Sequence, residues 1–247
     1  MYRFFVEPAQ IQEHTITITG NDVNHIKNVL RMKKGEELWI SDQEEKEYHC
    51  YIEEFLEEEI LAHIMYVQEP GFELPGRIYL FQGLPKGEKM EWIIQKAVEL
   101  GVHEIIPVSM KRCVVKLDKK KAEKKTARWQ QIAESAAKQS KRMKIPRIHP
   151  VCTYGEALEY ADESCQVRLV PYERTEGMKE TKEMIEQIKP GQSIGIFIGP
   201  EGGFDEKEIE AALQAGMKPI SLGKRILRTE TAGMTILSVL MFHLETC

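Results

Sequence analysis

Hydrophobic and polar residues alternate along the first part of the chain. The stretch from Thr15 to Thr19 has a period of two, and so does the stretch around Glu37 to Ile40. This pattern is typical of strands that bury one face. Acidic residues cluster between Asp42 and Glu59, where we expect a solvated hairpin. Residues 1–72 are therefore predicted to form a small domain made mostly of strands.

A short helix is expected to interrupt these strands. Asn21 or Asp22 can cap it, because a short polar side chain accepts a hydrogen bond from the free amides of the first turn. The apolar residues at helical spacing that would share its buried face are Val23, Ile26, Val29 and Leu30.

The pattern changes at the Pro-Gly pairs of residues 70–71 and 75–76, which mark a break in the chain. Beyond them the apolar runs are continuous, as expected for a parallel sheet with helices on both faces. A mostly parallel α/β domain is therefore predicted over residues 73–247. Its strands are expected at 77–82, 104–108, 166–171, 193–198 and 218–222, and its helices at 89–100, at about 121–140 and around 236–244.

Charge is distributed unevenly along the 247 residues. The net charge is −5, but 14 Lys and Arg between Lys111 and Arg147 stand against three acidic residues. This stretch therefore carries +11, and the rest of the chain carries −16. Concentrated cations favour contact with the phosphates of a nucleic acid. For residues 119–125 a highly charged, solvated helix remains an equally good interpretation.

The composition excludes several other classes of protein. No run of 18 apolar residues occurs, and the first residues lack the apolar stretch of a signal peptide. The five cysteines include no Cys-x-x-Cys pair, and the seven histidines form no cluster with Asp or Glu. We therefore expect a cytoplasmic protein with reduced thiols, no membrane span and no metal site.

Two glycine-containing segments follow predicted strands late in the α/β domain. The first is Gly199-Pro200-Glu201-Gly202-Gly203-Phe204, after which Asp205 can cap a helix with Glu208 as its capping-box partner. The second is Ser221 to Ala232, which leads into the last helix. Ligands of open α/β sheets bind at the carboxyl ends of strands, and glycine lets the backbone approach a ligand closely. The alternative is that these glycines only make tight turns.

Neither segment is a known nucleotide-binding loop. A phosphate-binding P-loop has Lys and then Ser or Thr after its last glycine, whereas Gly203 is followed by Phe204. The Gly-x-Gly-x-x-Gly spacing of dinucleotide-binding folds is absent from the sequence. A nucleotide-hydrolysing enzyme is therefore a remote alternative.

Taken together, the two segments resemble the last motifs of the SPOUT methyltransferases, and in particular the ribosomal small-subunit RNA (uracil-N3)-methyltransferase family. The second motif is carried by Leu222-Gly223 and by Arg225-Ile226-Leu227-Arg228-Thr229-Glu230-Thr231-Ala232. The resemblance extends over nearly the whole chain, through residues 24–35, 84–96, 128–133 and 136–140. One departure is Lys111, where this family often has a carboxylate before the residue equivalent to Arg112.

The resemblance implies a PUA-like β-barrel domain for RNA binding, followed by a SPOUT domain with a deep trefoil knot. It also implies a homodimer and S-adenosylmethionine as the cofactor, bound by three loops at the knot. The residues that would bind this cofactor are Val170, Pro171, Tyr172, Gly199, Pro200, Gly202, Gly203, Ser221, Leu222, Gly223, Ile226 and Leu227.

The implied reaction is methylation of N3 of a uridine in the 16S ribosomal RNA of the 30S subunit. It needs a proton acceptor and a group that anchors or polarises the base. Arg228 is the candidate for the second role, and Glu201 or Glu230 is the candidate proton acceptor. Glu201 could instead stabilise a helix terminus, and Arg228 with Glu230 could form a structural ion pair. The candidate RNA contacts are Arg31, Arg112, Lys138, Gln139, Arg142 and Arg147.

Two further functions remain open from the sequence. One is a non-catalytic, RNA-binding factor for ribosome assembly that retains the SPOUT fold. The other is a methyltransferase that acts on a different RNA base, since the acceptor atom rests on the family resemblance alone.

Overall fold

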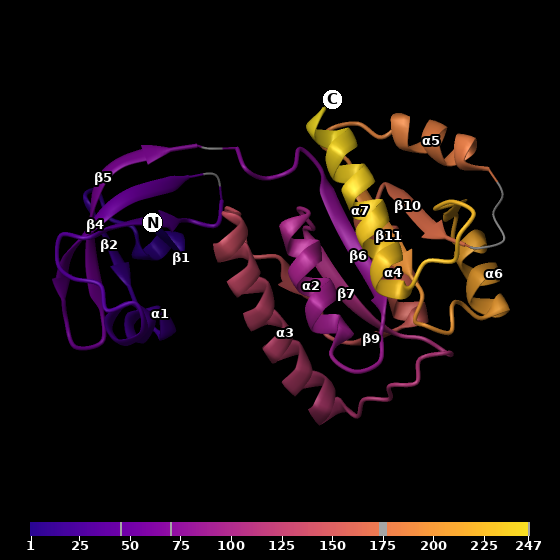
Figure 1. Cartoon of the computed structure of the whole chain (residues 1–247), viewed down its shortest axis with the longest axis horizontal. Coiled ribbons are helices and arrows are strands. Elements are labelled where there is room, and N and C mark those ends of the chain that lie inside the picture. The colour runs from indigo at the N-terminus through magenta and orange to yellow at the C-terminus, as the bar shows by residue number, and fades with distance from the viewer. Residues whose placement is uncertain (45, 70, 173–176, 247) are drawn as a thin grey trace. The chain divides into compact units, whose positions relative to one another are not determined.

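The computed structural model describes residues 1–44, 46–69, 71–172 and 177–246 (Figure 1). The chain divides into two compact units, of which the first contains Met1–Glu73 and Ala137–Ile145. The second contains Leu74–Ala136 and Pro146–Cys247. Pro70 and Cys247, which entered the analysis of the sequence, lie outside the described residues. The sequence predicted a single domain boundary after residue 72. The structure shows in addition that residues 137–145 belong to the first unit.

The first unit is built on a curled five-stranded sheet with the strand order β1-β3-β4-β5-β2. β1 pairs in parallel with β3, and the other pairs are antiparallel. The alternation in the sequence places Ile16, Ile18, Leu38 and Ile40 in one buried core with Phe4. Its elements are β1 (Tyr2–Phe5), η1 (Pro8–Gln10), β2 (Thr15–Ile18), α1 (Asn21–Asn24), η2 (His25–Val29), β3 (Glu37–Ser41), β4 (Glu47–Phe55) and β5 (Ile60–Gln68).

The short helix of this unit differs from the prediction at both ends. The residue before α1 is Gly20, which has a φ of 69°, and neither Asn21 nor Asp22 caps the helix. After α1 the chain widens into the π-helix η2, where the Leu30 amide donates to the His25 carbonyl at 2.9 Å. The wider turn rotates Val29 away from the core, so that it is 64% exposed. Val29 was therefore wrongly assigned to the buried face.

The acidic stretch forms strands, but its first carboxylates are not solvated. Glu47 is fully buried, pairs with Arg3, and accepts a hydrogen bond from the Gln68 side chain at 3.0 Å. Asp42 is also buried, and its Oδ1 accepts the backbone amides of Glu44 and Lys46 at 2.9 and 3.1 Å. The expectation of a solvated hairpin is confirmed for the turn between β4 and β5, where Glu57 to Glu59 are exposed. It is wrong for Asp42 and Glu47, because these carboxylates find partners inside the unit.

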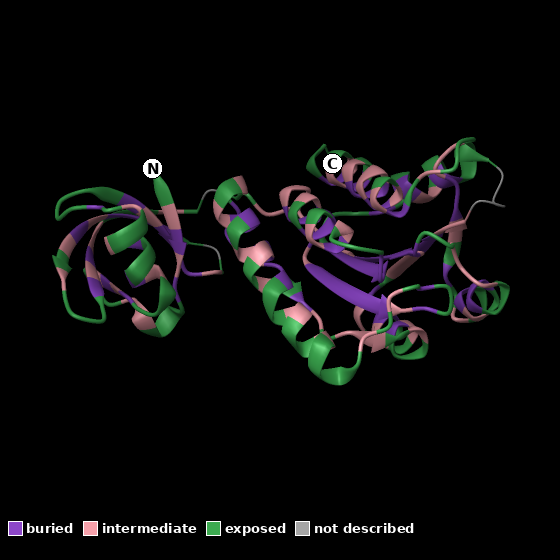
Figure 2. Ribbon diagram, turned by 60° about the horizontal axis from the view of Figure 1, so that its bottom comes forward, coloured by how far each residue is buried: buried purple, intermediate pink, exposed green. Residues whose placement is uncertain are grey.

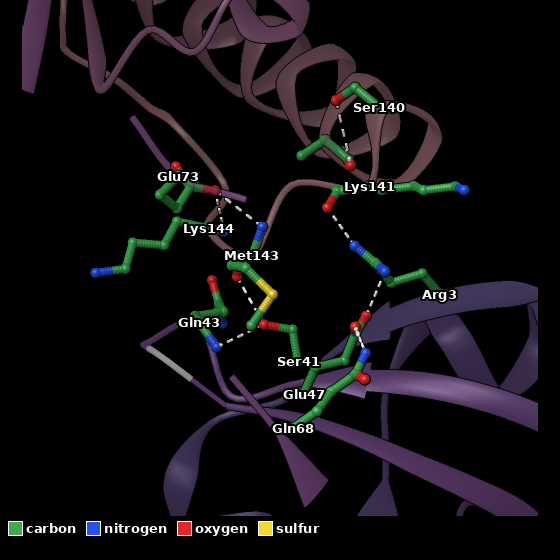
Figure 3. Close-up of polar contacts among 11 residues, drawn as sticks. Arg3, Ser41, Gln43, Glu47, Gln68, Glu73, Ser140, Lys141, Met143 and Lys144 are labelled. Carbon is green, nitrogen blue, oxygen red and sulfur yellow. Dashed lines mark hydrogen bonds and ion pairs between the residues drawn. The ribbon is translucent and has the colours of Figure 1, made fainter. Parts of the chain in front are cut away.

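The first unit is completed by residues 137–145, which hydrogen bonds attach to its sheet (Figure 3). The Ser41 hydroxyl donates to the Met143 carbonyl at 2.7 Å, and Arg3 donates to the Lys141 carbonyl. The Glu73 carboxylate accepts the backbone amides of Met143 and Lys144 at 2.9 and 3.2 Å. These hydrogen bonds make residues 137–145 a part of the first unit, although they lie far from it in the sequence.

Parallel strands form the second unit, in the order β12-β10-β11-β6-β7-β8, with β9 also paired to β7. Its strands are β6 (Arg77–Gly83), β7 (Glu104–Ser109), β8 (Arg147–Ile148), β9 (Cys152–Thr153), β10 (Val167–Pro171), β11 (Ser193–Ile198) and β12 (Lys218–Ile220). Its helices are α2 (Lys89–Glu99), α3 (Lys119–Ser140, whose end belongs to the first unit), α4 (Tyr154–Ser164), α5 (Met178–Glu186), α6 (Glu206–Gln214) and α7 (Thr229–Glu245).

Helices cover both faces of this sheet, which explains its continuous apolar strands (Figure 2). On one face the ring of Phe81 stacks on Phe197 at 4.2 Å and meets Tyr160 of α4. On the opposite face the side chain of Gln82 contacts Thr229 at the start of α7. Among the described residues, no helix combines the length and hydrophobicity needed to cross a membrane.

Candidate active site

Three loops at the carboxyl ends of adjacent strands line one pocket in the second unit. They follow β10, β11 and β12, which are neighbours in the sheet. Because parallel strands end at the same edge, loops from three distant parts of the chain meet there. The pocket has a volume of about 480 Å³. It is lined by Lys89, Pro171, Tyr172, Ile198, Gly199, Pro200, Glu201, Gly202, Gly203, Phe204, Ser221, Leu222, Gly223, Arg225, Ile226, Leu227, Arg228, Thr229 and Ala232.

The loop after β11 is shaped by its glycines and by the helix that follows. Gly203 has a φ of 67°, a conformation that side chains disfavour. Asp205 accepts the Lys207 amide at 3.3 Å and forms a capping box with Glu208, which confirms the predicted start of α6. A Cβ on Gly199 would lie 3.2 Å from the carbonyl carbon of Gly203. A side chain at position 199 would therefore crowd the backbone of Gly203, which would have to move by a few tenths of an ångström.

A buried hydrogen-bonded chain fixes the inner wall of the pocket. Gln82 donates to the Thr229 hydroxyl at 2.9 Å, and this hydroxyl donates to the Gly199 carbonyl at 2.6 Å. Gly83 lies directly beneath the loop, since a Cβ there would come within 2.8 Å of the Pro200 backbone nitrogen. The end of β6, the loop after β11 and the first turn of α7 are thus held in contact.

A lysine connects the two candidate glutamates. The Lys89 ammonium lies 3.0 Å from Oε1 of Glu201 and 3.4 Å from Oε2 of Glu230. The same Oε1 of Glu201 accepts the Lys86 amide at 3.1 Å. Partial burial acts to raise the pKa of Glu201, but hydrogen bonds from backbone amides and from Lys89 outweigh it and lower this pKa. Glu201 lines the pocket, and Glu230 lies 3.4 Å from Lys89, which lines it as well.

Basic residues reach the outer side of the same loop. Arg112 donates to the Gly202 carbonyl at 3.1 Å, and Lys111 lies 2.9 Å from Oδ1 of Asp205. The hydrogen bond from Lys111 is the main cause that lowers the pKa of Asp205. Lys111 therefore pairs with a carboxylate at the start of α6.

The structure brings together most of the residues expected to bind a cofactor. Eleven of the twelve line the pocket, and the exception, Val170, is fully buried in β10. Glu201 and Arg228 also line it. Sequence reasoning missed Lys89, although it falls within the segment 84–96 that carries the family resemblance. It also missed the pocket residues Ile198, Phe204, Thr229 and Ala232, and it placed Arg225 in the third loop without naming it as a site residue.

The candidate RNA contacts divide between the two units. Arg112 and Arg147 belong to the second unit, and both side chains are largely exposed. Arg31 is exposed in the first unit, as is Gln139. Lys138 is half-buried there and lies 2.8 Å from Asp22.

The prediction for Arg142 is wrong. This residue is only 5% exposed, and its guanidinium group pairs with Glu73, with Nε 3.2 Å from Oε1. Burial acts to raise the pKa of Glu73, but the hydrogen bonds from Arg142 and from two backbone amides lower it overall. A guanidinium group held in this way is not available to an RNA phosphate.

The described part of the chain contains no group of three or more His, Cys, Asp or Glu residues placed to hold a metal ion. Four described cysteines, Cys50, Cys113, Cys152 and Cys165, are free thiols. Burial raises the pKa of Cys50, Cys152 and Cys165 to about 12, so these thiols stay protonated near neutral pH.

Comparison with known families defines the class of this fold and pocket. Residues 72–241 match the model of an RNA methyltransferase domain, and residues 18–61 match that of an RNA methyltransferase PUA domain. The chain is 38% identical to ribosomal RNA small subunit methyltransferase E of Bacillus subtilis (strain 168), over 99% of this chain and 98% of that protein.

Two further relatives cover nearly the full length. The same enzyme of Mesomycoplasma hyopneumoniae (strain 232) is 37% identical, over 96% of this chain and 98% of its own. The crystal structure of the Neisseria gonorrhoeae enzyme, bound to S-adenosylmethionine, superposes with a TM-score of 0.84 at 33% identity, over 98% of this chain and 97% of that one. The chain belongs to the ribosomal RNA small subunit methyltransferase E family.

Proposed function

We propose that this protein transfers a methyl group from S-adenosylmethionine to N3 of a uridine in the 16S ribosomal RNA of the small subunit. The observation that carries the proposal is the pocket formed by three loops at the ends of β10, β11 and β12. Membership of the methyltransferase E family supports the reaction class. The uridine and its N3 atom are the finer part of the proposal, and they rest on the family resemblance.

The pocket suits this cofactor in size and chemistry. Its volume of about 480 Å³ lies within the range of small-molecule sites. Leu222, Ile226 and Leu227 offer apolar walls for a flat base, and backbone amides of the glycine loops offer hydrogen-bond donors. The lack of a side chain at Gly199 lets this loop pack closely against Gly203 and Phe204. When bound, S-adenosylmethionine supplies a methyl group on a sulfonium, which a direct displacement transfers without a metal ion.

The charged residues of the pocket would provide the two groups that the reaction needs besides the cofactor, a proton acceptor and an anchor for the base. Uracil N3 carries a proton that must leave, and negative charge develops on the flanking carbonyl oxygens. Arg228 lines the pocket and would anchor the base through these oxygens. Glu201 lines the pocket as well and would accept the proton, and its lowered pKa keeps it ionised at neutral pH. Glu230 is the weaker candidate because it does not line the pocket.

Each unit offers its own contribution to RNA binding. In the second unit, Arg112 lies beside the pocket loop and would contact a phosphate near the target base. Arg147 is exposed in the same unit, and Arg31, Lys138 and Gln139 belong to the first. Exposed cations that replace counterions contribute much of the affinity of such proteins for RNA.

The homodimer, the deep trefoil knot and the cytoplasmic location stay predictions. Trp92 of α2 and Val239 and Phe242 of α7 are exposed on helices that contact each other. Large exposed apolar side chains on adjacent helices favour an interface between subunits. They support a second copy of the chain as the partner.

The test is incubation of the purified protein with labelled S-adenosylmethionine and small ribosomal subunits from a strain without this enzyme. We expect label in 3-methyluridine, identified by mass spectrometry of the nucleosides. Arg228→Ala should abolish it, whereas Arg77→Ala should not, because Arg77 is exposed at the opposite end of β6.

The other outcomes separate the alternatives. Label in a different nucleoside would support methyl transfer to RNA and would refute N3 of uridine as the acceptor atom. Cofactor binding without labelling of either subunits or free 16S RNA would favour a non-catalytic assembly factor. Failure to bind S-adenosylmethionine by calorimetry would refute the enzymatic proposal.

A further inference from the structure

Lys89 joins three separate elements of the second unit. It is the first residue of α2, Glu201 belongs to the loop after β11, and Glu230 lies in the first turn of α7. The lysine side chain is 35% exposed and lines the pocket, and both carboxylates are more buried than it is. One ammonium group therefore bridges two carboxylates that lie 29 residues apart in the sequence.

The position of Lys89 is not explained by the stability of its helix. The first turn of a helix carries a partial positive charge, so a cation at its first residue is disfavoured. The helix already has Lys96 in its last turn, where a cation is favoured. The contact with Glu201 and Glu230 is thus what Lys89 provides at this position.

We propose that Lys89 is a positioning residue for methyl transfer, which holds the Glu201 carboxylate toward the acceptor base and fixes its distance from the first turn of α7. This inference rests on the proposed function, since it assigns Glu201 as the group that takes the base proton. The raised pKa of Lys89, caused first by its hydrogen bond to Glu201, keeps the bridge charged over the working range of pH.

The step that Lys89 supports is balanced without a further reactant. The N3–H bond of uracil breaks, its proton passes to Glu201, and N3 forms a bond to the methyl carbon as the carbon–sulfur bond breaks. The sulfur leaves as a neutral thioether, and Glu201 later releases the proton to water. Lys89 takes no part in the bond changes and acts through the direction and charge of Glu201.

Among the residues that the structure describes, Lys89 is the cation that pairs with both glutamates, and other charged groups lie in or near the pocket. Arg225 and Arg228 line the same pocket from the loop before α7. Arg112 and Asp205 lie on the outer side of the loop, at Gly202 and at the start of α6. Removal of Lys89 therefore leaves Glu201 beside Glu230 with one close cation fewer, which should raise the pKa of Glu201.

The test compares Lys89→Met with Lys89→Arg and with the matched control Lys96→Met. Lys96 lies on the same helix, is equally exposed and pairs with Glu99 at 2.9 Å, away from the pocket lining. Single-turnover rates are measured against pH with small ribosomal subunits. Binding of S-adenosylmethionine is measured by calorimetry, and the Glu201 carboxyl is titrated by carbon NMR in the cofactor-free protein.

In Lys89→Met we expect the rate at pH 6 to fall by about a hundredfold, the cost of a misplaced catalytic group. The acidic limb of the rate profile should move to higher pH, because a base with a raised pKa is protonated sooner as the pH falls. The carboxyl titration of Glu201 should move in the same direction, while the dissociation constant of the cofactor stays within about twofold. Lys89→Arg should restore most of the rate, and Lys96→Met should change neither profile.

Three results would overturn the inference. One is an unchanged rate profile and an unchanged Glu201 titration in Lys89→Met. Another is weaker cofactor binding with an unchanged single-turnover rate, which would make Lys89 a cofactor ligand instead. The third is loss of rate in Lys89→Arg equal to that in Lys89→Met. Lys89→Gln serves if Lys89→Met unfolds, and a wild-type protein that methylates no uridine would refute the proposed function first.

Discussion

The two units of the molecule use their charged residues in opposite ways. In the first unit the pairs of Arg3 with Glu47 and of Arg142 with Glu73 are largely buried and connect segments far apart in the chain. In the second unit the contacts of Lys89 with its two glutamates stay partly open to the pocket. Charges of the first kind serve the fold, and those of the second kind remain available to ligands.

This difference shows that a basic stretch of sequence is not one functional surface. Arg112 and Arg142 both lie in the segment that carries a net charge of +11. The first lies exposed beside the pocket loop, and the second is enclosed by its carboxylate partner. A buried ion pair contributes little net stability, but removal of one partner leaves an unpaired charge behind. The comparison can therefore be tested with single substitutions.

The largest effect is expected for Arg142→Met. It leaves the half-buried Glu73 without its guanidinium partner, so the free energy of unfolding should fall by about 3 kcal/mol. Urea denaturation followed by circular dichroism measures the change. Lys144→Met is the control, because Lys144 binds Glu73 through its backbone amide alone and should change stability by less than about 0.5 kcal/mol. Equal effects of the two substitutions would mean that the pair has no structural role.

A smaller effect is expected for Gly83→Ala beneath the pocket. The added methyl would lie 2.8 Å from the Pro200 backbone nitrogen and 2.9 Å from the Met110 sulfur, so the loop after β11 must shift. Overpacking of this kind costs about 1–3 kcal/mol of stability, and the shifted loop should bind S-adenosylmethionine more weakly. Thermal denaturation and calorimetric titration measure the two quantities.

Gly155→Ala is the matched control for this change. A Cβ at Gly155 meets no atom within 4 Å, and the residue lies in α4 away from the pocket. Alanine in a helix is more favourable than glycine by up to about 1 kcal/mol, so this variant should be as stable as the parent or more so. Normal cofactor binding by Gly83→Ala would contradict the close contact between β6 and the loop.

The smallest effect on stability is expected for Arg112→Gln, whose side chain is exposed. The free energy of unfolding should change by less than about 0.5 kcal/mol. The salt dependence of RNA binding, plotted as log K against log salt concentration, should lose roughly one unit of slope if one phosphate contact disappears. Arg77→Gln, outside the basic stretch, should leave this slope unchanged. A slope unaffected by Arg112→Gln would remove this residue from the RNA surface.

The sequence predicted what depends on neighbouring residues. The strand at Ser193–Ile198 has the expected bounds, and Asp205 forms the expected cap. Both follow from local rules, hydrophobic periodicity and side-chain capping. Two of the three pocket loops, those after β11 and β12, were found because each follows a strand, and parallel strands bring such ends together; the loop after β10 came from the family resemblance.

What the sequence did not predict depends on distant residues or on a local irregularity. The burial of Arg142 requires Glu73, and the role proposed for Lys89 requires Glu201, which is 112 residues away. Neither pairing leaves a periodic signal. Val29 was misplaced because a π-helix breaks the spacing on which the prediction relied.

The return of residues 137–145 to the first unit has a consequence for the order in which the protein is made. Synthesis proceeds from the N-terminus, and an N-terminal domain generally folds before the rest of the chain has emerged. Here the Glu73 carboxylate and the Ser41 hydroxyl have no access to Arg142 and Met143 until 145 residues have left the ribosome. A nascent chain that ends near residue 110 should therefore hold a first unit that protease still digests, and a gene fragment that encodes residues 1–73 alone should yield an incomplete fold.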